Sequence, residues 1–270
     1  MAKAKKAAKK PAKKEVKRKI LKATPTIRVA AVKSAKRAAK GAPIKKIKPS
    51  SSAPAKEQRV PGRPILHGMF LSIPSCKVGL ALTMMGIAFD YRHVDLASGA
   101  HKTPGFLAKN RFGQVPVLEH DGHFLSQSNV ILQYLADTYG KLAGRSAAEE
   151  IRIAEWLQWD QDRMASLGMA RAFTRFPQMK PSDQALEFVT KRAEMALDVL
   201  DRHLGTSKFI AGVQPSIADV AIFPWVATAD EAGIAIARWP NIQGWAERFM
   251  KLPGACHPYS AMPKQDRIGN

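Results

Sequence analysis

The sequence is poor in cysteine and lacks any long apolar run. Among 270 residues, Cys76 and Cys256 are the two cysteines. Two distant thiols exclude a disulfide scaffold and indicate a reducing compartment, so we expect a cytoplasmic protein. No apolar run reaches the roughly 18 residues of a membrane span, and no secretory signal follows the start. Neither a metal-binding Cys/His cluster nor a Gly-rich phosphate loop is visible, so we expect no metal site.

The first 63 residues lack aromatic side chains and contain almost no acidic ones. They hold 22 of the 43 basic residues but 2 of the 22 acidic residues, a net charge of +20, whereas residues 64–270 carry +1. A segment of this composition cannot bury enough apolar surface to offset the entropy of ordering, so we expect disorder. The Lys/Ala/Pro-rich composition resembles histone H1-type tails. It predicts binding to nucleic acid or another polyanion without base readout. A targeting segment and a spacer without a partner remain open.

A Pro- and Ser-rich stretch, residues 49–64, marks the boundary between this tail and the body. The tail is expected to span residues 1–63. The body is expected to comprise an α/β domain over 64–142 and an all-helical domain over 148–258. In the first domain, strands over 65–69 and 89–95 enclose a helix that begins at Ser75, which requires a parallel crossover. A hairpin follows, and Asp121-Gly122 supplies its tight turn.

The stretch from Asn110 to Asn129 organises the body. Pro116 cannot donate a ladder hydrogen bond, so we place it at the start of a strand, and a cis peptide bond there is inexpensive. Apolar residues recur at helical spacing after Ser128. A helix N-terminus near Ser128 offers free backbone N–H groups to a carboxylate.

The second half reads as a series of helices. Apolar stripes predict helices over 149–164 and 182–203. Ser216 and Asp219 have the spacing of a capping box in front of an apolar helix over 220–229. Trp239-Pro240 fits the start of a further helix.

In this order, the motifs resemble the glutathione S-transferase superfamily across residues 64–258, in a serine-type, bacterial, zeta- or theta-like form. The resemblance implies an α+β fold, in which a thioredoxin-like domain (βαβαββα) precedes an all-α domain. It also implies a cis bond before Pro116, glutathione as co-substrate with no other cofactor, and a homodimer. Ser72 and Ser75 stand where thioredoxin-fold redox proteins carry Cys-x-x-Cys, which argues against disulfide exchange at this site.

The resemblance also assigns residues. Ser72 would be catalytic, holding the glutathione sulfur as a thiolate. The other glutathione contacts would come from His101, Lys102, Gln114, Val115, Gln127 and Ser128. A pocket for a second substrate is expected between Met69, Phe70 and Leu71 and a helix that carries Trp159 and Arg163. Other interpretations stay open: Ser72 as a helix cap (though Ser75 is the preferred cap), and packing roles for His67 and Cys76.

The predicted function is conjugation of glutathione to a small electrophile, as in detoxification. One alternative is a glutathione-dependent isomerase or lyase, which the same site would support. Another is a non-catalytic interaction module of a nucleic-acid-associated protein, in which the tail is the functional part.

Overall fold

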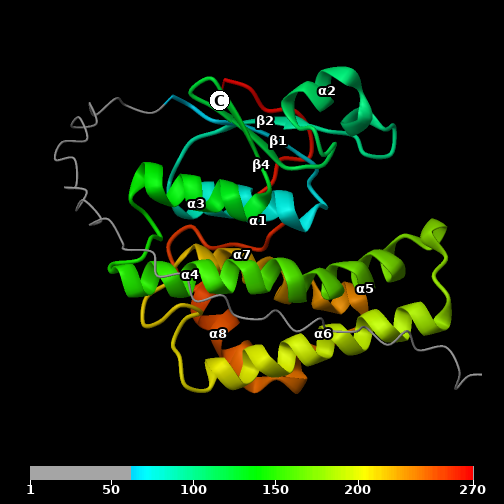
Figure 1. Ribbon diagram of the computed structural model, residues 1–270, viewed down its shortest axis with the longest axis vertical. Coiled ribbons are helices and arrows are strands. Elements are labelled where there is room, and N and C mark those ends of the chain that lie inside the picture. The colour runs from blue at the N-terminus through cyan, green and yellow to red at the C-terminus, as the bar shows by residue number, and fades with distance from the viewer. Residues whose placement is uncertain (1–61, 270) are drawn as a thin grey trace, which may run out of the picture. The chain divides into compact units, whose positions relative to one another are not determined.

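A computed structural model describes residues 62–269 (Figure 1). The tail predictions therefore lie outside the described residues, apart from Gly62 and Arg63. The described chain has a four-stranded sheet with helices on both sides, followed by a helical half. None of its helices is both long and apolar enough to cross a membrane.

The sheet is mixed and has the order β2-β1-β3-β4. Its strands are β1 (Ile65–Gly68), β2 (Asp90–His93), β3 (Val117–His120) and β4 (His123–Ser126). β1 runs parallel to β2, and the pairs β1–β3 and β3–β4 are antiparallel. Asp121 and Gly122 form the hairpin turn with φ of 47° and 80°, as a two-residue type I′ loop requires.

Two helices lie between the sheet and the helical half (Figure 1): α1 (Ile73–Met84) and α3 (Ser128–Tyr139). The short α2 (Pro104–Lys109) lies on the far side of the sheet, after a 3-10 turn, η2 (Ala100–Lys102). The expectation that α1 begins at Ser75 is wrong. Ser72 is its N-cap and accepts from Ser75 N, because Pro74 fits the first helical turn without needing a hydrogen bond.

The helical half begins with a long, interrupted helix. α4 (Ala147–Trp159) continues through a π-helical turn, η3 (Asp160–Met164), into α5 (Ala165–Arg175). The remaining elements are η4 (Pro177–Met179), α6 (Asp183–Leu204), α7 (Ile217–Val226), η5 (Ala229–Ala232), η6 (Ile236–Arg238) and α8 (Pro240–Met250). A π turn contains one residue more than an α turn, so side chains after Trp159 do not continue the face that the earlier periodicity predicts.

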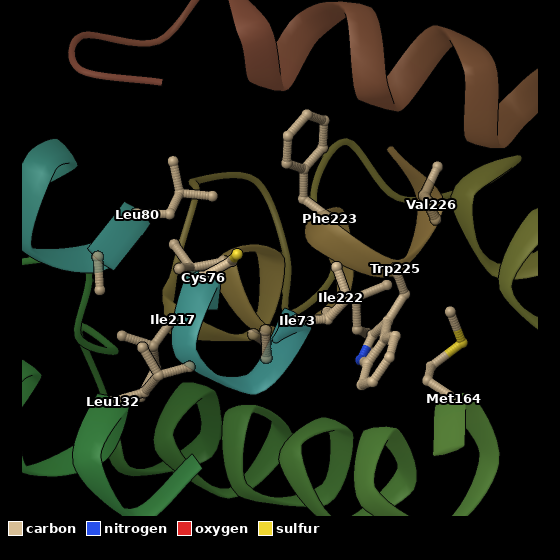
Figure 2. Close-up of a cluster of buried hydrophobic side chains, with 14 of the residues drawn as sticks. Ile73, Cys76, Leu80, Leu132, Met164, Ile217, Ile222, Phe223, Trp225 and Val226 are labelled. Carbon is tan, nitrogen blue, oxygen red and sulfur yellow. The ribbon is translucent and has the colours of Figure 1, made fainter. Parts of the chain in front are cut away.

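All ten residues of α7 are buried, and this helix forms the centre of the core. Figure 2 shows Ile73, Cys76 and Leu80 of α1 gathered around Ile217 and other side chains of α7. The capping box at the start of α7 is present. The Asp219 carboxylate accepts from Ser216 N and Ile210 N (2.9 Å each), from Ser216 Oγ at 3.2 Å and from Trp245 Nε1 at 2.9 Å.

The last residues return from the helical half to the sheet, which the sequence does not reveal. Arg267 forms a bridge with Tyr91 in β2, and Asp266 pairs with Arg92 at 3.0 Å. Gly269 N donates to Asp90 Oδ1 at 3.0 Å. Asp90 also pairs with Arg63 at 2.9 Å, so both ends of the described chain meet at this side chain.

Candidate active site

A cavity of about 500 Å³ opens beside the start of α1. Its lining comprises Ser72, Pro74, Leu96, His101, Lys102, Asn110, Gly113, Gln114, Val115, Pro116, Gln127, Ser128 and Gln161. All seven residues predicted to hold glutathione or its sulfur line this single cavity, although they are spread over 57 positions of the sequence (72 to 128). The site therefore arises where the N-termini of α1 and α3 meet the loop before β3.

Ser72 lies at the N-terminus of α1 and faces this cavity. Its Oγ accepts from Ser75 N at 3.4 Å. Because the oxygen accepts, the hydroxyl proton stays available to donate toward the cavity. The partial positive charge of a 12-residue helix favours an anion at the same place. The cap and the sulfur-holding role are thus compatible in one side chain.

One end of the cavity is basic. His101 and Lys102 form the turn η2, and Lys102 Nζ donates to Gly113 O at 2.9 Å. Gly113 has a φ of +57°, and a Cβ there would lie 3.0 Å from both Lys102 Nζ and His101 O, so the turn needs glycine. His101 Nδ1 is buried without a hydrogen-bond partner.

The middle and the other end of the cavity are built by the loop before β3 and by the start of α3. The Val115–Pro116 peptide bond is cis, and Asn110 Nδ2 holds the preceding loop through Gln114 O at 2.7 Å. Gln127 has a φ of +69°, which is uncommon for a residue with a side chain and is often found at functional sites. It places Ser128 at the first turn of α3.

The residues expected to form the second-substrate pocket do not line this cavity. The ring centroids of Trp159 and Trp156 are 5.0 Å apart, and the Trp156 ring lies 4.6 Å from that of His203 in α6 at a tilt of 48°. Arg163 is exposed and pairs with Asp162 at 2.9 Å. Gln161, in the π turn between them, lines the cavity, and the second-substrate pocket stays a prediction. Met69, Phe70 and Leu71 are half-buried in the loop before Ser72, and Phe70 lies near His93.

Two alternatives to Ser72 lie elsewhere. His67 Nε2 contacts Glu119 Oε2 at 3.0 Å in a separate cavity, and burial lowers the pKa of its imidazole. Cys76 is fully buried, its Sγ lies 3.2 Å from Phe70 O, and burial raises the pKa of its thiol to about 12. Neither side chain can reach a ligand beside Ser72, so both fit the packing interpretation.

Sequence reasoning missed a buried ionic network behind the cavity. Lys77 Nζ donates to Asp160 Oδ2 at 2.5 Å, and both side chains are completely buried. Asn129 Nδ2 and Trp225 Nε1 donate to the same carboxylate at 2.9 and 2.8 Å. The signal in the sequence was Lys77 itself, a single cation in an otherwise apolar helix. The network joins α1 and α3 to the π turn.

The arrangement suits a peptide-like anion that carries a sulfur. A basic end, a free hydroxyl at one helix N-terminus and a second helix N-terminus can hold two carboxylates and a thiolate. Among the described residues, no group of three or more His, Cys, Asp or Glu side chains could hold a metal ion.

Comparisons with known proteins identify the class of protein to which this fold and cavity belong. The glutathione S-transferase N-terminal domain matches residues 65–137, and the corresponding C-terminal domain matches residues 183–248. A glutathione S-transferase structure from Pseudomonas fluorescens is similar with a TM-score of 0.68 and 30% identity, covering 73% of this chain and 99% of that one.

Curated relatives point to the same family. Glutathione S-transferase 3 of Zea mays is 29% identical over 73% of this chain and 94% of its own length. The disulfide-bond oxidoreductase YghU of Escherichia coli is 29% identical over 64% of each chain. The chain belongs to the glutathione S-transferase family, and it is an enzyme of that family that uses glutathione as a substrate.

Proposed function

We propose that the enzyme transfers the glutathione thiolate to a small electrophile and that Ser72 stabilises this thiolate. The observation that carries the proposal is the convergence of Ser72, the basic turn and the start of α3 on one cavity. A free thiol has a pKa near 8.5 and is mostly protonated at neutral pH. A hydrogen bond to the charged form contributes about 1.5–3 kcal/mol, or roughly one to two pKa units. That shift makes the thiolate a major species.

The cavity suggests how glutathione lies. The glycyl carboxylate binds at His101 and Lys102, and the cysteinyl backbone pairs with Val115. The γ-glutamyl carboxylate receives the N–H groups and the hydroxyl at the start of α3, where Gln127 and Ser128 lie. The sulfur then points to Ser72 at the N-terminus of α1. Each negative group of the ligand then meets a hydrogen-bond donor.

The test is Ser72→Ala, with Ser72→Thr as a rescue and Ser98→Ala, in an exposed loop, as a matched control. We expect Ser72→Ala to lower turnover with a model electrophile roughly 10- to 100-fold and to reduce the thiolate absorbance of bound glutathione at pH 7. Glutathione affinity should change far less, and Thr should restore part of the rate. If rate and absorbance stay unchanged, Ser72 has no role in the chemistry.

A second candidate is thiol–disulfide exchange, which the similarity to a disulfide-bond oxidoreductase favours. With Cys76 buried, the nucleophile would be glutathione itself. Its thiolate attacks a disulfide, forms a mixed disulfide and releases one thiolate, and a second glutathione completes the exchange. Product analysis separates this reaction from conjugation, and also from the isomerase or lyase alternative. Absence of binding to a glutathione resin would favour a non-catalytic module.

The body is also proposed to form a homodimer through α3 and α4. A groove of about 410 Å³ lies between these helices, and Phe124, Val130 and Ile151 are 45%, 55% and 61% exposed nearby. Exposed apolar groups gathered around a groove favour a protein contact. Val130→Asp should give a monomer in sedimentation. An unchanged dimer would place the interface elsewhere.

For residues 1–63 we propose polyanion binding, because their net charge is +20. If about six to ten phosphates are neutralised, affinity should fall on the order of 10³- to 10⁵-fold between 50 and 200 mM salt. A chain starting at Pro64 should lose this binding and keep its activity. Undiminished DNA binding by the shortened chain would contradict the proposal.

A further inference from the structure

The cavity beside Ser72 contains no carboxylate in its lining, as far as the described residues go. Its charged side chain is Lys102, joined by the titratable His101, and the other polar residues are hydroxyls and amides. Glutathione carries an ammonium group on its γ-glutamyl part in addition to two carboxylates. In the pose given above, that ammonium lies at the start of α3, next to the carboxylate that the helix holds. The acceptors that the described lining offers to it are therefore neutral oxygen atoms.

Gln161 lines the same cavity and supplies such an oxygen. Among the described residues, it is the one lining residue that comes from the helical half. Its side-chain amide makes no hydrogen bond to any other residue between 62 and 269, so both its oxygen and its nitrogen are available. Gln133 and Gln243, by contrast, donate to carboxylates on their own helices.

The backbone beneath Gln161 is fixed relative to the start of α3. Asp160, the preceding residue, is buried and accepts from Lys77 and Asn129. Asn129 directly follows Ser128, and its Nδ2 also donates to Leu157 O at 2.7 Å. The π turn and the first turn of α3 are thus tied together by buried hydrogen bonds. A side chain on such a base loses less entropy when it binds a ligand than one on a mobile loop.

We propose that Gln161 is a substrate-binding residue whose side-chain oxygen accepts a hydrogen bond from the γ-glutamyl ammonium of glutathione. Gln127 is the second neutral acceptor, and Asp160 is a positioning residue that acts through the backbone of Gln161. This inference rests on the proposed function. It has a consequence for specificity: the cavity discriminates between γ-glutamyl peptides and their deamino analogues through an amide at position 161.

The experiment compares two ligands on four proteins. The ligands are glutathione and its deamino analogue, glutaryl-cysteinylglycine, which differs by loss of the ammonium. The proteins are the wild type, Gln161→Ala, Gln161→Glu and, as matched control, Gln184→Ala in an exposed turn of α6. Dissociation constants come from calorimetric titration, and the unfolding midpoint of each variant is recorded.

We expect Gln161→Ala to raise the dissociation constant of glutathione about tenfold, the lower end for loss of a hydrogen bond to a charged group. The dissociation constant of the analogue should stay unchanged. Gln161→Glu should strengthen glutathione binding and not that of the analogue, because it adds a carboxylate beside the ammonium. Gln184→Ala should change neither. Equal loss for both ligands, or no loss, would overturn the role of Gln161. A wild type that binds neither ligand would instead overturn the proposed function.

Discussion

Replacing Asp219 with alanine should destabilise the whole body, because this carboxylate serves more than a helix cap. It is completely buried and accepts four hydrogen bonds, from Ile210, Ser216 (two) and Trp245. Burial raises the pKa of Asp219 to about 6, and the four donors oppose that shift. Loss of a cap costs about 1–2 kcal/mol, and each further buried donor left without a partner costs about 1–3 kcal/mol. With the two further donors, Ile210 N and Trp245 Nε1, the expected total is about 3–8 kcal/mol.

The assay is urea unfolding at pH 7, with the thermal midpoint measured beside it. For a body of this size, the expected loss lowers Tm by at least about 6 °C. The matched control is Ser182→Ala, which removes an exposed cap of α6 that makes one hydrogen bond of 3.2 Å, and should cost about 1 kcal/mol. Glutathione affinity of the folded fraction should stay the same in both. If Asp219→Ala lowers the free energy of unfolding no more than Ser182→Ala does, the four buried hydrogen bonds of Asp219 do not stabilise the fold as expected.

Three further predictions concern buried titratable groups. Lys77→Met leaves the Asp160 carboxylate buried without its cation and should lower the free energy of unfolding in urea by about 3–5 kcal/mol. Addition of Asp160→Asn should recover part of that loss. If Lys77→Met alone is as stable as the wild type, solvent reaches the pair. Burial lowers the pKa of the His67 imidazole in the folded protein. Below about pH 6.5 the unfolded chain therefore binds more protons than the folded one, and stability falls as the pH drops. His67→Gln should lose less Tm than the wild type between pH 7.5 and 5.5, and an equal loss in both proteins would refute this. Cys76, with its thiol pKa raised to about 12, should resist alkylation at pH 8 until the protein unfolds, and mass spectrometry would detect any early label.

Local patterns in the sequence predict the sheet and most helices. The turn residues Asp121-Gly122 determine the hairpin, and the apolar stripe of α6 gives its bounds to within one residue. Ser216 and Asp219 predict the start of α7, because a capping box depends only on residues that are neighbours in the sequence. The resemblance adds the seven residues at the cavity, since their separation in sequence gives no hint that they meet.

The sequence could not reveal features that depend on tertiary contacts. The π turn at 160–164 follows no periodicity, so the sequence did not indicate that Gln161 would line the cavity. The pairing of Lys77 with Asp160 joins positions 83 residues apart. The misplaced start of α1 has a local cause, because Ser72 and Ser75 both fit a cap and Pro74 between them decides which one serves.

The meeting of both described ends at Asp90 makes the body a candidate for circular permutation. Gly62 O lies 2.7 Å from His120 Nε2, and Gly62 N donates to Asp121 Oδ1 at 3.0 Å. Gly269 N donates to Asp90 Oδ1. A short Gly/Ser linker from Gly269 to Gly62 would close the chain without disturbing the sheet. New ends could then be opened in the link before α4, where Arg145 and Ser146 are exposed.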